Sequence, residues 1–180
     1  MVSYVLIPIS LLYLLIFYLI RIFKTEYKID IPIICIGNIN LGGTGKTSTL
    51  LEIINHFKIN NKNICVLLKG YGGKKTIFKK VTPDESAVLV GDEAILYSNH
   101  VPTYISTNRR LAVKKILDDV NPDFILLDDG FQDKSLFKDK NILMVNGARG
   151  FGNGLCLPAG PLRELILSLI HISEPTRPNT

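Results

Sequence analysis

The stretch from Ile31 to Thr49, IPIICIGNINLGGTGKTST, decides the fold. An apolar run rich in isoleucine leads into a glycine-rich turn and then into Lys46 and Thr47, and the residues from Thr49 to about Phe57 are compatible with a helix. A strand, a glycine-rich loop and a helix in this order are typical of a phosphate-binding P-loop. In such a loop, backbone N–H groups and the helix N-terminus face one point and favour an anion there. The alternative is an ordinary turn between strand and helix, which leaves the GGTGKT sequence unexplained.

The loop supplies the candidate nucleotide contacts. They are Asn40, Gly42, Gly43, Thr44, Gly45, Lys46, Thr47 and Ser48. We expect Lys46 to bring a mobile positive charge to the β- and γ-phosphates of ATP, and the Thr47 hydroxyl to ligate Mg²⁺. Asn40 replaces the first glycine of the usual G-x-x-x-x-G-K-[ST] pattern. Since Asn tolerates a left-handed backbone better than most residues, we expect the loop to close.

A second strong signal is the sequence DFILLDDG, from Asp123 to Gly130. Its four apolar residues predict a buried strand that ends on two carboxylates, Asp128 and Asp129. Buried carboxylates are unfavourable unless a cation meets them. In P-loop enzymes an Asp at this position holds Mg²⁺, so we expect these two side chains beside the P-loop.

Other apolar runs, at 64–68, 101–106 and 141–145, predict further strands, and 109–120 has apolar residues at helical spacing. The fold class we expect is therefore α/β, with a mostly parallel P-loop-type sheet flanked by helices. Open sheets of this kind bind ligands beyond the carboxyl ends of their strands. The GYGG sequence at 70–73 follows a predicted strand and is consistent with such a site or with a plain turn.

Two charged pairs outside the P-loop also attract attention. Asp92 and Glu93 follow a glycine and are typical of a helix N-terminus, with Asp92 as the cap. Arg163 and Glu164 close a glycine- and proline-rich segment, and such a segment is costly to order unless it binds something. The guanidinium of Arg163 suits bidentate contact with phosphate.

The N-terminus is strongly apolar. The nineteen residues from Val2 to Ile20 carry no charge, and basic residues follow them. A helix of this length spans about 28 Å, close to the thickness of the bilayer's hydrocarbon core. We therefore expect a membrane anchor over 1–24, with the rest of the chain on the cytoplasmic side. The alternative is a buried core helix.

The composition of the chain limits its number of domains, its redox compartment and its binding partners. A chain of 180 residues allows one ordinary domain. The three cysteines lie in or beside apolar runs without metal-ligand spacing, which indicates small buried residues in a reducing compartment. The net charge of +5 comes from basic pairs such as Arg109–Arg110 that we expect on solvated faces. These pairs carry no interleaved aromatic residues, so we expect no nucleic-acid partner, although they suit an anionic membrane surface.

Five motifs, in this order and spacing, resemble the tetraacyldisaccharide 4'-kinase (lipid A 4'-kinase) family. They are GN-x-x-x-GGTGKT, GYGGK, VGDE, DDGFQ and RGFGNG-x-x-LPAGPLRE, and the resemblance covers roughly Pro32 to Glu164. The resemblance implies transfer of the γ-phosphate of ATP, with Mg²⁺, to the 4'-hydroxyl of a tetraacylated glucosamine disaccharide 1-phosphate. It also implies a monomer at the inner (cytoplasmic) membrane, with the lipid surface and the acylated disaccharide as partners.

The resemblance assigns roles by motif. The catalytic set is Asp92, Lys46 and Arg163, with Asp92 as the acid–base carboxylate in place of a helix cap. The metal set is Thr47, Asp128, Asp129 and Glu164.

Three departures from the family pattern stand out. Asp133 occupies the position where the family has histidine after DDGFQ, and Lys69 replaces an arginine. Family members are also much longer. We therefore expect an anchor at 1–24, a P-loop kinase domain at 30–164, a non-native tail at 165–180 and a missing second lobe, so that the fragment binds ATP weakly and turns over poorly.

Two rival functions remain. A membrane-attached P-loop ATPase of the partition or septum-placement type would carry a signature Lys where this chain has Leu41. A non-catalytic fragment would retain only membrane attachment.

Overall fold

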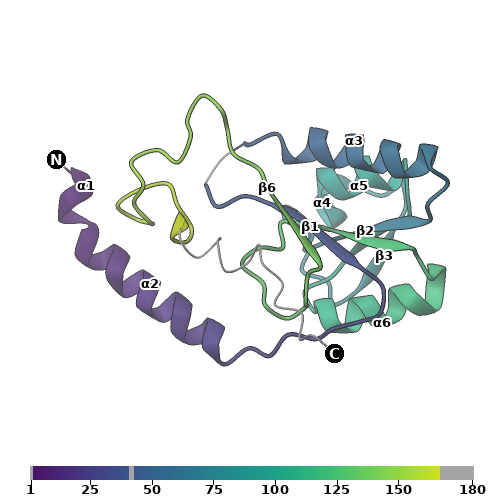
Figure 1. Ribbon diagram of the computed structural model, residues 1–180. Helices are drawn as coiled ribbons and strands as arrows, with labels where there is room; N and C mark the ends of the chain where they lie inside the picture. Colours follow the sequence, from purple (N-terminus) through teal and green to yellow (C-terminus); the bar gives the residue numbers. More distant parts are fainter. Residues whose placement is uncertain (1, 41–42, 167–180) are drawn as a thin grey trace.

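A mostly parallel sheet organises the chain (Figure 1). The computed structural model describes residues 2–40 and 43–166. In this part of the chain the strands are β1 (Ile33–Gly37), β2 (Ile64–Leu68), β3 (Lys79–Val81), β4 (Thr103–Ile105), β5 (Phe124–Asp128) and β6 (Lys140–Leu143). The helices are α1 (Val2–Val5), α2 (Ile7–Ile22), α3 (Lys46–Ile59), α4 (Ala87–Val90), α5 (Asp92–Ser98) and α6 (Arg109–Val120).

The strand order is β3-β4-β2-β5-β1-β6. Every neighbouring pair is parallel except β3–β4, which is antiparallel. The central strands β2, β5 and β1 are the apolar runs of the sequence, as expected for parallel strands covered on both faces. The predicted α/β class is confirmed. β3 was not predicted, because its sequence KKV is short and mostly charged and it lies at an edge.

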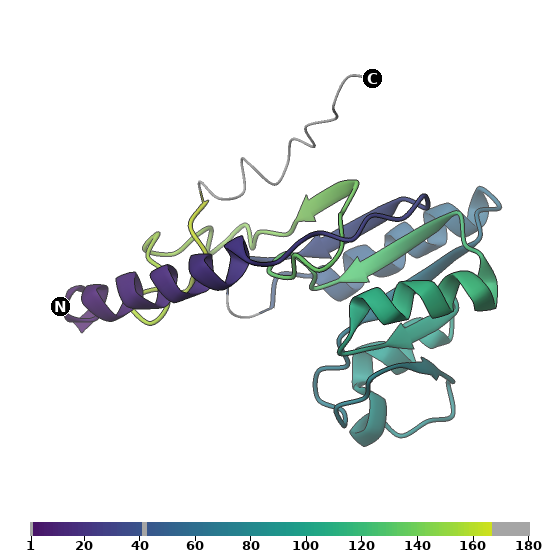
Figure 2. The same ribbon diagram turned by 90° about the horizontal axis from the view of Figure 1, so that it is seen from below.

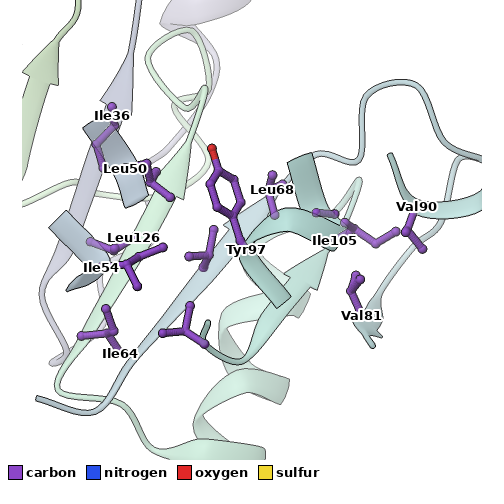
Figure 3. Close-up of a cluster of buried hydrophobic side chains, with 13 residues drawn as sticks. Ile36, Leu50, Ile54, Ile64, Leu68, Val81, Val90, Tyr97, Ile105 and Leu126 are labelled. Carbon is purple, nitrogen blue, oxygen red and sulfur yellow. The ribbon is translucent and has the colours of Figure 1, made fainter. Parts of the chain in front are cut away.

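Helices cover both faces of the sheet. On one face α3, α4 and α5 enclose a cluster that includes Ile54, Leu126 and the ring of Tyr97, whose hydroxyl points out of the cluster (Figure 3). On the other face α6 packs against a second cluster around Ile125. Cys35, Cys65 and Cys156 are free and buried, as predicted. These two layers fix the strand ends that carry the polar loops.

The N-terminal helix lies to one side of the sheet (Figures 1 and 2). The apolar run breaks at Leu6, and α2 restarts with Pro8 in its first turn, where the missing N–H of proline is tolerated. No helix among residues 2–40 and 43–166 is both long and apolar enough to cross a bilayer, so the predicted membrane helix is not confirmed. The alternative of a buried core helix is wrong, because several apolar side chains of α2, among them Leu11 and Leu15, are more than half exposed.

The segment after β6 returns to the sheet edge beside α2 (Figure 2). Isolated bridges join Leu162 to Asn40 and to Cys156. A small apolar cluster of Ile39, Cys156 and Leu162 packs against Leu14 of α2. The predicted tail lies almost wholly outside the described residues, since only 165 and 166 of it are described.

Candidate active site

Loops from four parallel strands meet at the carboxyl edge of the sheet. They follow β1, β2, β5 and β6, and this edge is where open α/β sheets bind ligands. The GYGG loop after β2 is more than a plain turn, since it contacts the start of α5. Gly91 has a φ of 91°, and a Cβ there would lie 2.4 Å from the carbonyl oxygen of Tyr71. Glycine at 91 therefore allows the GYGG and VGDE motifs to meet.

The P-loop delivers Lys46 at the start of α3. Gly45, with a left-handed φ of 77°, is the N-cap residue, and Lys46 and Thr47 open the helix. Thr44 is buried and its hydroxyl accepts a hydrogen bond from the Asn38 amide at 3.2 Å. Of the remaining predicted nucleotide contacts, Gly43 and Ser48 are exposed. Gly42 lies outside the described residues, as does Leu41.

Asn40 acts differently from the prediction. It is not among the described non-glycine residues with a positive φ, so the expected left-handed backbone is not observed. Its side-chain amide instead donates to the carbonyl oxygen of Gly150 at 2.6 Å. Asn40 therefore ties the P-loop to the glycine-rich loop after β6.

Asp129 joins the P-loop to the end of the LPAGPLRE motif. One carboxylate oxygen lies 3.0 Å from the Lys46 ammonium, and the guanidinium of Arg163 lies 3.1 Å from the other. Burial alone would raise the pKa of Asp129, but the charges of Lys46 and Arg163 outweigh it and hold the pKa below its usual value. Asp129 also has a φ of 50°, a strained backbone of the kind that clusters at functional sites. Two cations thus converge on one point, where phosphate oxygens could replace the carboxylate.

Asp128, the preceding residue, is buried beside Tyr97 and Glu93 of α5. Burial, reinforced by the nearby Glu93 carboxylate, raises the pKa of Asp128 to about 6. The Tyr97 hydroxyl donates to one oxygen at 3.3 Å, and the other oxygen is buried without a partner among the described residues. Such an oxygen fits a cation.

Mg²⁺ needs few protein ligands at this site. No group of three or more His, Cys, Asp or Glu side chains in the described ranges is placed to hold a metal by itself. Mg²⁺ in nucleotide sites is usually held by one or two carboxylates together with phosphates and water. Asp128 and Asp129 meet that requirement.

Glu93 approaches the P-loop, which the sequence did not predict. Its carboxylate accepts a hydrogen bond from the Thr47 hydroxyl at 3.0 Å. Asp92 is exposed and is the first residue of α5, whose N-cap is Gly91, so the predicted cap at Asp92 is wrong. Both carboxylates of VGDE therefore lie at the helix end nearest the P-loop. The acidic pair is visible in the sequence, but the contact of Glu93 with Thr47, 46 residues away, is not.

Glu164 is fully buried and ion-paired. The guanidinium of Arg21, at the end of α2, lies 2.8 Å from one of its oxygens, and the Gln132 amide donates to the other at 3.1 Å. The sequence assigned Arg21 only to the basic flank of the anchor. Gln132 belongs to the DDGFQ motif, so two of the motifs meet at Glu164.

Arg109 and Asp133 hold the backbone of the turn that follows β5. Arg109 was expected on a solvated face, but this is wrong, because its side chain is only 2% exposed. It donates to the carbonyl oxygens of Asp128 and Asp129 at 3.2 and 3.1 Å, and pairs with Asp133 at 3.3 Å. Burial opposes ionisation of Asp133, but Arg109 and the backbone N–H of Ser135 lower its pKa overall. Asp133, which departs from the family pattern, thus pairs with the arginine that holds the backbone of the two candidate metal ligands.

The motifs that meet at this edge are shared with known proteins. A sequence model described as tetraacyldisaccharide-1-P 4'-kinase matches residues 2–173. This chain belongs to the tetraacyldisaccharide-1-P 4'-kinase family. The partition-type ATPase alternative is therefore wrong.

Relatives in this family extend beyond the region that matches. A tetraacyldisaccharide 4'-kinase from Jannaschia sp. is 41% identical over 140 residues, covering 76% of this chain and 42% of the relative. One from Ruthia magnifica is 36% identical over 177 residues, covering 93% and 56%. The chain spans about half the length of these relatives.

A solved structure has the same fold. LpxK from Aquifex aeolicus, crystallised in complex with ATP, superposes with a TM-score of 0.81 at 31% identity. The match covers 96% of this chain and 57% of that protein. The sheet covered by helices on both faces is therefore a fold that this chain shares with the Aquifex protein.

Proposed function

We propose that this chain carries the nucleotide-binding part of a lipid A 4'-kinase. In this proposal ATP is the phosphoryl donor, and the acceptor is the 4'-hydroxyl of a tetraacylated glucosamine disaccharide 1-phosphate. The observation that carries the proposal is the convergence of Lys46 and Arg163 on Asp129, 3.0 and 3.1 Å away, at the end of a P-loop sheet. Family membership and the ATP bound to the Aquifex protein support it.

The residues of the chain divide the work of phosphoryl transfer. Catalysis of this reaction is largely positioning and charge stabilisation. Lys46 would move from Asp129 to the β- and γ-phosphates, and Arg163 would bind the transferring group. Asp92, exposed at the start of α5, would accept the proton of the sugar hydroxyl.

The proposed metal ligands are Thr47, Asp128, Asp129 and Glu164. When bound, Mg²⁺ would neutralise charge on the phosphates of ATP. The partnerless oxygen of Asp128 is the observation that favours a cation most directly. Glu164 is the most buried member of this set, and Arg21 and Gln132 engage both of its oxygens.

We also propose that α2 lies on the cytoplasmic surface of the inner membrane and that the chain acts there as a monomer. Apolar side chains follow the outer face of α2, and their exposed fractions run from 47 to 73%: Ile9, Leu11, Leu12, Leu15, Ile16, Leu19, Ile20 and Ile22. A helix with one apolar face open to solvent suits the boundary between headgroups and acyl chains. The basic residues Lys24 and Lys28, which follow α2, would meet anionic lipid.

A transfer assay tests the proposal. Radiolabelled ATP is supplied with the acylated disaccharide 1-phosphate, or with a 4'-deoxy analogue, in mixed micelles. We expect slow labelling of the first acceptor only, no label with the variant Lys46→Ala, and unchanged transfer with Lys62→Ala, an exposed lysine just beyond the C-terminal end of α3. Equal labelling of both acceptors, or transfer that survives Lys46→Ala, would refute the proposed function.

A further inference from the structure

Helix α2 contacts the candidate site along one stripe. Ser10, Leu14, Phe17 and Arg21 follow one another at helical spacing on the face turned toward residues 156–164, and Tyr13 lies beside them. The opposite face carries the exposed apolar side chains. The helix therefore has two distinct faces: one packs against the protein, and the other is exposed.

Hydrogen bonds fix the LPAGPLRE segment to this stripe at three places. The Ser10 hydroxyl donates to the carbonyl oxygen of Cys156 and accepts from the backbone N–H of Ala159, both at 3.0 Å. The Tyr13 hydroxyl donates to the carbonyl oxygen of Arg163 at 2.9 Å. The third place is the ion pair between Arg21 and Glu164.

Arg163 is held from both sides by these contacts. Its backbone N–H donates to the carbonyl oxygen of Ile39 at 2.7 Å, which joins it to the segment between β1 and Lys46. Its carbonyl is held by α2, and its side chain reaches Asp129. A shift of the segment at Glu164 would therefore move the guanidinium that faces the phosphate position.

The ion pair between Arg21 and Glu164 is shielded from water. The Glu164 side chain is 0% exposed and that of Arg21 is 10% exposed, so water does little to screen them. A buried carboxylate that loses its cationic partner is strongly unfavourable, and the chain around it must rearrange or take up a proton. The cation–π contact of Arg21 with the Phe17 ring further fixes its guanidinium.

We propose that Arg21 is a positioning residue of the nucleotide site, acting through Glu164 to hold Arg163 where it meets phosphate. The helix that carries the exposed apolar face is then a structural part of the active site as well. This inference rests on the proposed function only for its nucleotide readout.

The test compares Arg21→Gln with Lys24→Gln, which removes the same charge from an exposed side chain three residues away. We expect Arg21→Gln to weaken Mg·ATP binding about tenfold, within the usual range for coupled sites. We expect Arg21→Lys to restore most of the affinity and Lys24→Gln to leave Mg·ATP binding in solution unchanged. In a double-mutant cycle, adding Arg21→Gln to Glu164→Gln should give no further loss, because Arg21 acts through Glu164.

Amide hydrogen exchange gives a readout that needs no nucleotide. The N–H groups of Leu162 and Arg163 should exchange faster in Arg21→Gln than in wild type or Lys24→Gln, with native melting behaviour retained. Arg21→Gln that matches Lys24→Gln in exchange overturns the inference, whether or not ATP binds. Losses from Arg21→Gln and Glu164→Gln that add fully also overturn it. Wild-type chain that binds no ATP refutes the proposed function alone, and the exchange data then decide the role of Arg21.

Discussion

Asp128 and Asp129 are neighbours in the chain, yet the two sides of the turn after β5 are chemically opposite. Asp129 faces Lys46 and Arg163 and has a lowered pKa. Asp128 lies beside Tyr97 and Glu93 of α5, and burial raises its pKa to about 6. The difference shows how one short motif places two carboxylates in different environments: one orders the cations of the site, and the other has a buried oxygen without a hydrogen-bond partner among the described residues.

The largest expected effect comes from Asp129→Asn. Loss of this carboxylate should weaken the Mg²⁺-dependent part of ATP binding about 100-fold, the upper range for changes around a metal site. ATP binding without Mg²⁺ should not weaken, because Lys46 and Arg163 lose the carboxylate that competes with phosphate. Titration of ATP with and without Mg²⁺ measures both quantities. A loss of equal size in the two titrations would show that Asp129 does not distinguish metal from phosphate.

The substitution Asp128→Asn should make the folded protein more stable. Because burial raises the pKa of Asp128, the folded protein binds this proton more tightly than the unfolded chain does. Stability from this group therefore falls as pH rises from about 4 to about 6. The variant should be more stable than wild type by about 1–3 kcal/mol at pH 8, with a gain that vanishes near pH 4.

Urea unfolding at the two pH values measures the effect of Asp128→Asn. A variant less stable than wild type at pH 8 would mean that Asp128 already has sufficient polar partners in the folded protein. The comparison between the two sides of the turn would then fail.

Asp133→Asn should have the smallest effect. Its carboxylate pairs with the buried Arg109 that braces the carbonyl groups of Asp128 and Asp129, so its loss should lower stability by about 1–2 kcal/mol at pH 7. The pKa of Asp133 is lowered, so its contribution is present above the unfolded pKa of about 3.8 and is lost as pH falls through the lower folded value.

Thermal melts at pH 7 and pH 3 check this prediction, with Asp118→Asn as the control on the exposed face of α6. The two variants should differ at pH 7, and the difference should be smaller at pH 3, because the contribution of Asp133 declines below the unfolded pKa. Identical melting at pH 7 would show that Arg109 needs no carboxylate to hold the turn.

The sequence predicted the parts of the fold that local patterns specify. Apolar runs identified β1, β2 and β5, and the glycine-rich turn predicted a helix from Thr49, because each pattern reports on neighbouring residues. The helix begins three residues earlier, at Lys46. The break at Leu6 was less visible, since proline is tolerated in a first turn and Pro8 fits either one helix or two.

The sequence did not predict contacts between residues that lie far apart in the chain. Arg21 and Glu164 are separated by 143 residues, and nothing near Arg21 distinguishes it from the exposed Lys24. Arg109 begins a helix with a basic sequence, and only the turn after β5, folded against it, shows that its charge is buried. Long-range ion pairs depend on the tertiary fold, and a single sequence does not reveal them.

The most direct measurement is a calorimetric titration of the chain with ATP and Mg²⁺, for wild type, Lys46→Ala and Lys62→Ala. If Lys46 belongs to a phosphate site closed by Asp129 and Arg163, wild type and Lys62→Ala will bind ATP equally. Lys46→Ala will then bind at least about tenfold more weakly, as expected for loss of a charged contact. Equal binding by all three chains would contradict the assignment of this sheet edge as a nucleotide site.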